Sequence, residues 1–131
     1  MKKIISLLVF CSTALLLNAQ VDVTNKGTLY ITGNTDTFSV TGNFTNASSA
    51  SLTNNGRFYA KQNYTNNQAS TPAGTGELTL NGTGTQYINT NGTSPFYKLT
   101  VNKASGLATL SSAVTINNTL TFTAGKLSLD N

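Results

Sequence analysis

The chain has 131 residues, of which only 9% are charged and none is histidine, and its formal net charge is +4. The absence of histidine and the single cysteine, Cys11, exclude His-based catalytic triads, the common zinc sites and a disulfide within the chain. The basic residues are scattered singly along the sequence. Because a nucleic-acid surface needs clustered Lys and Arg, we expect no nucleic-acid partner.

Residues 1–19 have the three parts of a secretory signal peptide. Met1–Lys3 is basic, Ile4–Leu17 is apolar, and the small residue Ala19 occupies the cleavage position. The apolar stretch is too short to cross a membrane comfortably, since about 20 residues are needed. We therefore expect cleavage after Ala19, a mature chain 20–131 without a membrane span, and a secreted or cell-surface location. Cleavage also removes Cys11.

After the signal peptide, short stretches with alternating apolar and polar residues are separated by turns rich in Gly and Asn. Asn67–Gly76, which holds Pro72 and no apolar pair, is expected to be a loop. No stretch carries apolar residues at helical spacing over about ten positions, so the mature chain is predicted to be all-β. The expected strands are 21–23, 28–32, 37–41, 50–52, 57–61, 77–80, 86–88, 97–101, 108–110, 114–116, 119–122 and 126–129.

Five strands share a pattern of an apolar residue, a polar or small residue and an apolar residue, which returns every 20 or 21 residues. A repeat of this length predicts a single-stranded parallel β-helix, a solenoid whose coils of 20–21 residues hold three short strands each. The alternative, an antiparallel sandwich or barrel, gives no reason for the pattern to return in register. The five copies are Phe38-Ser39-Val40, Phe58-Tyr59-Ala60, Leu78-Thr79-Leu80, Leu99-Thr100-Val101 and Leu120-Thr121-Phe122.

Stacked coils place equivalent residues of the repeat above one another. The apolar residues then form inward ladders, and the middle residues form one outward row, which is the only regular surface that the sequence reveals. This row consists of Ser39, Tyr59, Thr79, Thr100 and Thr121. At the corners, the pairs Asn43/Asn63 and Asn81/Asn102 can bond to each other and to the turn backbone. The corner dihedrals are assigned to Gly27, Gly33, Gly42, Gly56, Gly82, Gly92, Gly106 and Gly125.

The carboxylates of the mature chain are Asp22, Asp36, Glu77 and Asp130. Asp36 and Glu77 both lie near the start of equivalent strands, two coils apart. We interpret them as solvated corner carboxylates, because no companion base or row of cations joins them. We therefore expect no catalytic residue, no metal, no cofactor and no enzymatic activity.

The last expected strand, 126–129, is apolar on its inner side, and no polar capping segment follows it. An uncovered solenoid end exposes apolar side chains and unpaired backbone. We expect the chain to be the N-terminal part of a longer protein. The alternative is end-to-end self-association of copies through the uncovered end.

Several phrases of the sequence resemble the repeats of large adhesin-like surface proteins that Bacteroidetes export. They are Gly27–Asn34, Gly42–Asn46, Leu78–Gln86 and Phe96–Lys103, and the signal ending Asn18-Ala19-Gln20 is similar to the signals of those proteins. The resemblance covers nearly all of the mature chain and supplies no catalytic residues. Such proteins commonly end in a sorting domain of the type IX secretion system. This sequence holds none, which agrees with the expectation of a longer protein.

The function expected from these features is that of a non-catalytic exported surface protein. The β-helix would act as a stiff stalk or as an adhesin-like contact surface for a glycan or a cell-surface ligand. One alternative is the N-terminal part of a carbohydrate-active or carbohydrate-binding β-helix protein whose catalytic coil lies beyond Asn131. Another is an ice-binding solenoid that uses the outward threonines, although the strand propensity of threonine explains that row equally well.

Overall fold

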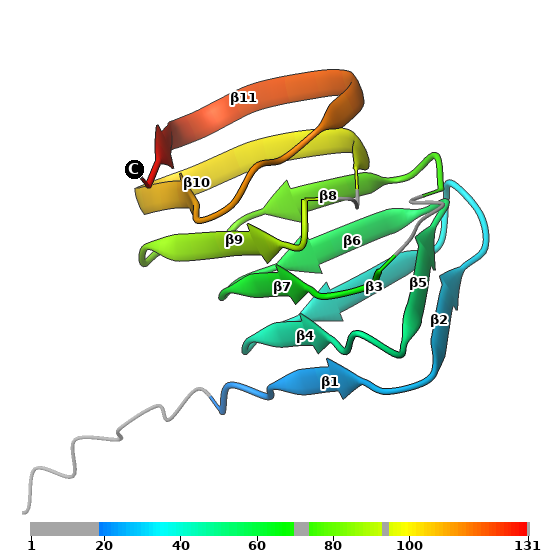
Figure 1. Cartoon of the computed structure of the whole chain (residues 1–131). Coiled ribbons are helices and arrows are strands. Elements are labelled where there is room, and N and C mark those ends of the chain that lie inside the picture. The colour runs from blue at the N-terminus through cyan, green and yellow to red at the C-terminus, as the bar shows by residue number, and fades with distance from the viewer. Residues whose placement is uncertain (1–18, 70–73, 93–94, 131) are drawn as a thin grey trace, which may run out of the picture.

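The computed structural model describes residues 19–69, 74–92 and 95–130. The described chain forms a β-solenoid of about 5 turns, with parallel pairing throughout and no helix (Figure 1). The predicted parallel β-helix is therefore confirmed, whereas the predicted signal peptide lies outside the described residues apart from Ala19. The strands are β1 (Val23–Asn25), β2 (Thr28–Ile31), β3 (Thr37–Val40), β4 (Phe44–Asn46), β5 (Ser51–Asn54), β6 (Arg57–Ala60), β7 (Tyr64–Asn66), β8 (Glu77–Leu80), β9 (Gln86–Thr90), β10 (Phe96–Leu110) and β11 (Ile116–Leu129).

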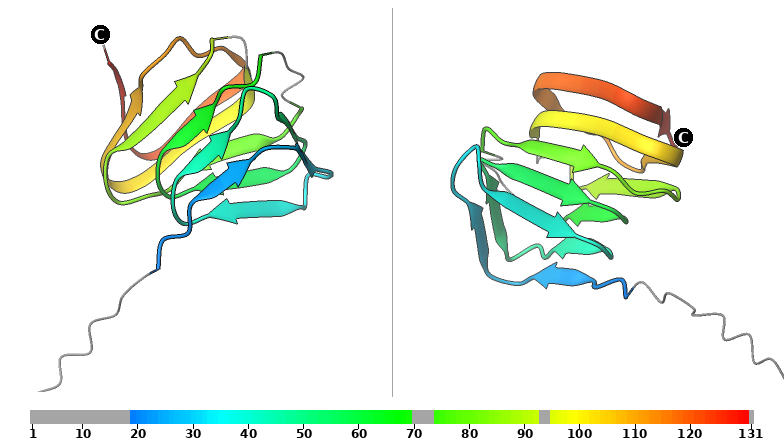
Figure 2. Two further views of the ribbon diagram at one scale, coloured as in Figure 1. Left: turned by 60° about the horizontal axis from the view of Figure 1, so that its bottom comes forward. Right: turned by 180° about the vertical axis from the view of Figure 1, so that it is seen from behind.

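The strands stack into three faces, which we name after their first strands. The β3 face consists of β3, β6, β8 and the first halves of β10 and β11. The β1 face consists of β1, β4, β7, β9 and the second halves of β10 and β11. The β2 face holds β2 and β5. Figure 2 shows how β10 and β11 each turn a corner and continue from one face onto the next.

The register between coils is the one that the repeat predicts. Phe38, Phe58, Leu78, Leu99 and Leu120 are successive partners on the β3 face. The second apolar ladder of the same face, which runs from Val40 to Phe122, is also in register. Each coil donates backbone hydrogen bonds to the preceding one, so the shift of 20 or 21 residues is fixed by the backbone as well as by the core.

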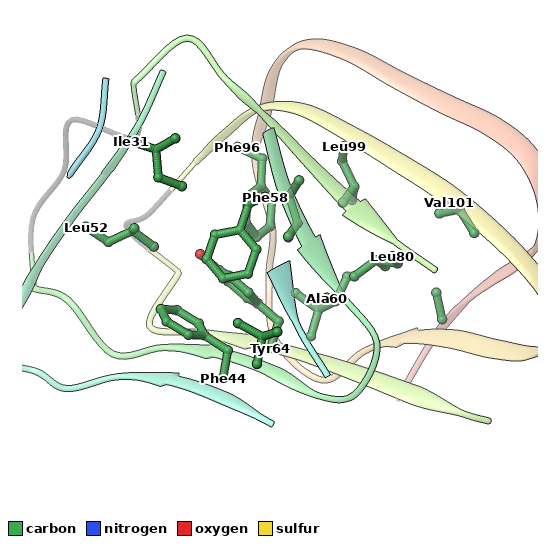
Figure 3. Packing of buried hydrophobic residues seen from close by; sticks show 14 residues of the cluster. Ile31, Phe44, Leu52, Phe58, Ala60, Tyr64, Leu80, Phe96, Leu99 and Val101 are labelled. Carbon is green, nitrogen blue, oxygen red and sulfur yellow. The ribbon is translucent and has the colours of Figure 1, made fainter. Parts of the chain in front are cut away.

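An aromatic cluster fills the first part of the core (Figure 3). The rings of Phe44 and Phe58 lie 4.8 Å apart and meet edge to face, while Phe44 and Tyr64 are stacked at 5.4 Å. Phe38 packs on Phe58 at 5.1 Å, and Phe96 packs on Tyr64 at 5.6 Å. Burial raises the pKa of Tyr64 well above its ordinary value. The cluster joins strands of the β1 and β3 faces and so closes the solenoid across its width.

A ladder of buried asparagines runs along one corner of the solenoid. Asn25 Nδ2 donates to Asn46 Oδ1 at 2.7 Å, and Asn46 Nδ2 donates to Asn66 Oδ1 at 2.8 Å. Asn46 Nδ2 also donates to Gln68 Oε1 at 3.1 Å. These amides satisfy one another inside the protein, where an unpaired polar group is costly. The sequence predicts stacked asparagines at the corners, but it does not single out this ladder.

The structure corrects several strand boundaries. The first strand begins at Val23 rather than at Val21, and the expected strand 114–116 is absent except that Ile116 begins β11. Two expected pairs of strands are each one continuous strand. The pair 97–101 and 108–110 is β10, and the pair 119–122 and 126–129 is β11. Strands β4 and β7 were not expected, because each carries only one apolar residue and ends in a buried asparagine.

The glycines divide into two groups with different roles. Among the described residues, only Gly74, Gly92, Gly106 and Gly125 have positive φ, so the general assignment of corner dihedrals to glycines is wrong for the others. Gly56 instead permits a close approach of coils. A Cβ added there would lie 2.5 Å from the carbonyl oxygen of Asp36.

The last described coil exposes apolar side chains. Leu120, Phe122 and Leu129 are 41%, 52% and 68% exposed, and no described strand pairs with the outer edge of β11. These values agree with the predicted uncovered end, while end-to-end association stays a prediction.

The first testable prediction concerns the apolar ladder of the β3 face. Leu99 is 0% exposed, so Leu99→Asp places an unpaired charge in the core and should lower the free energy of unfolding by more than about 4 kcal/mol. Leu120→Asp makes the same change in the same ladder at a position that is 41% exposed, and should cost less than about half as much. Thermal unfolding followed by far-UV circular dichroism measures both. Equal decreases in the free energy of unfolding for the two variants would contradict the assignment of Leu99 to the core.

The second prediction concerns the asparagine ladder. Asn46→Ala removes the three buried hydrogen bonds that Asn46 makes with Asn25, Asn66 and Gln68, and should destabilise the protein by about 2–4 kcal/mol. Asn89→Ala, at an exposed position on the β1 face, is the control and should change stability by no more than about 0.5 kcal/mol. Urea unfolding measures the difference, and similar midpoints for the two variants would argue against the ladder.

Candidate functional site

The predicted outward row lies in register on the β3 face, but its members differ in exposure. Ser39 and Thr121 are exposed, Tyr59 and Thr100 are half-buried, and Thr79 is only 6% exposed. Thr79 Oγ1 donates to Glu77 Oε1 at 3.3 Å. Accessible threonines therefore occupy only the last two coils of this row, which does not favour a flat threonine array for ice.

A second row of side chains runs beside the first on the β3 face. Its members are one residue before the apolar ladder, so alternation along the strands turns them outward as well. Arg57, Glu77 and Lys98 are successive partners in this row, with Thr37 before them and Thr119 after them. The sequence analysis did not single out this row, in which one cation lies on each side of Glu77. The sequence carries the signal, because each charged residue directly precedes a Phe or Leu of the repeat.

The charged row borders a groove at the corner where the chain enters the β3 face. The groove has a volume of about 230 Å³ and is lined by Asn34, Thr35, Asn55, Gly56, Arg57, Thr75, Gly76, Glu77 and Lys98. Among the described residues, no apolar side chain lines the groove. Its composition suits a polar, hydroxyl-bearing or charged ligand better than an apolar one.

The other carboxylates near the coil corners hold turns together. Asp36 Oδ2 accepts a hydrogen bond from the Gly33 amide at 3.0 Å, and Asp22 Oδ1 accepts one from the Asn43 amide at 2.7 Å. The predicted pair Asn43/Asn63 continues the second of these corners, because the Asn63 amide donates to Asn43 Oδ1 at 3.3 Å. Within the described residues, no group of three or more potential metal ligands occurs.

The β1 face carries a regular outward row that the sequence analysis missed. Thr24, Thr45, Thr65 and Asn89 are successive partners there, between inward positions on both sides. The outward row of the β3 face is therefore not the only regular surface. The alignment of Gly42–Asn46 with Gln62–Asn66 contained the signal, since it places Thr45 and Thr65 in equivalent positions.

Lys103 is a buried cation that the sequence analysis counted only among the singly scattered basic residues. Its side chain is 1% exposed, and Nζ donates to the carbonyl oxygens of Gly82 at 2.8 Å and Gly84 at 2.7 Å and to Gln86 Oε1 at 2.7 Å. Gln86 in turn donates to the carbonyl oxygens of Ala60 and Gln62. The two side chains tie three successive coils together at one corner. Burial lowers the pKa of Lys103.

Comparisons with protein families, with curated proteins and with solved structures gave no match for this chain. The fold thus rests on the structure itself, which defines the chain as a parallel β-solenoid. In the described part of the chain, no helix is long and apolar enough to cross a membrane.

The third prediction concerns the buried lysine. Because the pKa of Lys103 is lower in the folded protein, the unfolded chain binds the proton more strongly between that lowered pKa and the ordinary value of 10.5. The contribution of Lys103 to stability should therefore rise as the pH increases through this window. Lys103→Met removes this pH-dependent contribution. The wild type and the variant should therefore differ in free energy of unfolding by an amount that increases, in favour of the wild type, with pH up to about 10.5.

Urea unfolding at a series of alkaline pH values measures this difference. Other titrating groups, including Tyr64, are present in both proteins and cancel. Lys61→Met makes the same change of side chain at an exposed position and is the matched control. A flat or falling difference for Lys103→Met would contradict the buried position of the ammonium group.

Proposed function

We propose that this chain is a non-catalytic exported surface protein whose solenoid acts as a stiff stalk and presents the β3 face as an adhesin-like contact surface. The observation that supports it is the pair of outward rows on this face, which repeat in register from β3 to β11. Parallel stacking holds such rows about 4.8 Å apart from coil to coil, which favours ligands that repeat along the solenoid axis.

Three features of the chain agree with this proposal. The first 19 residues match a signal peptide, and the repeats resemble those of Bacteroidetes adhesin-like proteins that use type IX secretion. The carboxylates Asp22 and Asp36 are engaged in turns of the backbone.

A carbohydrate-binding function is the second candidate. The groove between Arg57 and Lys98 favours it, because hydroxyl groups of sugars bind to carboxylates, amides and cations of the kind that line this groove. An enzymatic version of this candidate needs a catalytic coil beyond Asn131.

The fourth prediction tests the contact surface. Beads coated with residues 20–131 should adhere to surfaces coated with mucin, cellulose or hyaluronan. Thr100→Gln combined with Thr121→Gln adds bulk to the outward row of the β3 face and should reduce bead retention by about fivefold or more on the surface that binds the wild type. Thr45→Gln combined with Thr65→Gln makes the same change on the β1 face and should have little effect.

Bead counts under defined flow measure retention, and circular dichroism verifies that both double variants are folded. Equal retention of the two double variants would contradict a contact role for the outward row of the β3 face. Failure of the wild type to adhere to any of the three surfaces would overturn the contact function.

A further inference from the structure

Two of the residues that line the polar groove, Gly56 and Gly76, lie at positions where successive coils approach closely. A Cβ at Gly56 would lie 2.5 Å from the carbonyl oxygens of Gly33 and Asp36, and a Cβ at Gly76 would lie 2.4 Å from the carbonyl oxygen of Gly56. Only glycine fits at these stacked positions. Residues of several successive coils line the groove, which therefore runs along the solenoid axis.

Three charged side chains of alternating sign stand along this groove. Arg57 and Lys98 are exposed and Glu77 is half-buried between them. Opposite charges on neighbouring strands favour stacking of the coils. No ion pair within 4.0 Å forms among these three groups, however, so their charges stay available to a ligand.

The orientation of the flanking groups supports an accessible site. Thr79 Oγ1 donates to Glu77 Oε1 and fixes the position of the carboxylate at the start of β8. The Lys98 ammonium lies 5.8 Å from the centre of the Tyr97 ring, a cation–π contact that leaves its hydrogen-bond donors free for a carboxylate. Asn34 and Thr35 also line the groove.

The spacing of the two cations matches a repeating polymer. Arg57 and Lys98 are two coils apart, which corresponds to about 9–10 Å along the axis. An extended chain of pyranose sugars advances by a comparable length with every two residues. A glycan that carries a carboxylate on every second sugar can therefore place one carboxylate against Arg57 and the next against Lys98. Arg57 binds its carboxylate through paired N–H···O bonds.

We propose that this groove binds an acidic glycan in which uronic acid residues alternate with uncharged sugars. The two carboxylates of such a glycan bind Arg57 and Lys98, and hydroxyl groups of the uncharged sugar between them donate to Glu77. A polymer with a negative charge on every unit, such as a polyuronate or the phosphate backbone of a nucleic acid, places one charge against Glu77. This repulsion makes the groove selective for the alternating pattern.

This inference rests on the proposed function, since it names the ligand class for one part of the contact surface. Its test is the binding of hyaluronan decasaccharide, which carries a carboxylate on every second sugar, to residues 20–131 by isothermal titration calorimetry. Polygalacturonate oligosaccharide, with a carboxylate on every sugar, should bind more weakly by about tenfold or more, and dextran oligosaccharide should not bind.

Variants separate the roles of the three side chains. Arg57→Gln combined with Lys98→Gln should weaken hyaluronan binding by more than about tenfold. Lys26→Gln combined with Lys61→Gln removes the same charge at exposed positions outside the groove and should weaken it by less than about threefold. Glu77→Gln removes the negative charge that repels the extra carboxylate of polygalacturonate. This variant should bind hyaluronan and polygalacturonate with more similar affinities than the wild type does.

Three results would overturn the assignment. The first is that the wild type does not bind hyaluronan. The second is that the two double variants lose affinity for hyaluronan equally. The third is that Glu77→Gln keeps the wild-type preference for hyaluronan over polygalacturonate. If hyaluronan fails to bind while coated beads still adhere to mucin or cellulose, the groove assignment fails and the contact function stands. If beads adhere to none of the surfaces and hyaluronan does not bind, both fail.

Discussion

Parallel stacking of coils in register is the constraint on which this structure depends. Each described strand after the first coil pairs with a strand one coil earlier, so that paired residues lie 19 to 24 positions apart in the sequence, at the spacing of adjacent strands. A slip of one residue in the pairing of a strand would move its side chains from the core to the surface, because the side-chain period of a strand is two. The groove, the outward rows and the core are all consequences of this one register.

The same constraint accounts for the low content of charged residues. A side chain in a stacked coil meets its equivalent in the next coil, and like charges at that distance repel each other. Asparagine avoids this cost because its amide is both donor and acceptor, so that Asn25, Asn46 and Asn66 can bond in series. Lys103 is buried without a carboxylate only because the corner backbone supplies two carbonyl oxygens to it.

The sequence was sufficient to predict the fold class, the coil length and the register of the β3 face, because those strands carry two apolar residues each at a constant shift. It was insufficient on the β1 face, where one apolar residue per strand and an inward asparagine obscure the alternation in β4 and β7. The charged row of the candidate site was visible in the sequence, but only by comparing equivalent positions of successive coils. The groove is lined by residues of several successive coils, and no local pattern of the sequence specifies how they come together.

A solenoid of this kind places its functional side chains in columns along the axis rather than around a pocket. This arrangement determines which ligands it can bind. A single-sign column would attract any polyanion and give little selectivity. The column Arg57, Glu77, Lys98 instead combines attraction at two coils with repulsion at the coil between them. Selectivity then depends on the period of charge along the ligand, measured against the fixed distance between coils. The rigidity that stacked backbone bonds give to the solenoid is what would allow such a distance to discriminate, because a flexible surface could shift its cations to meet either pattern.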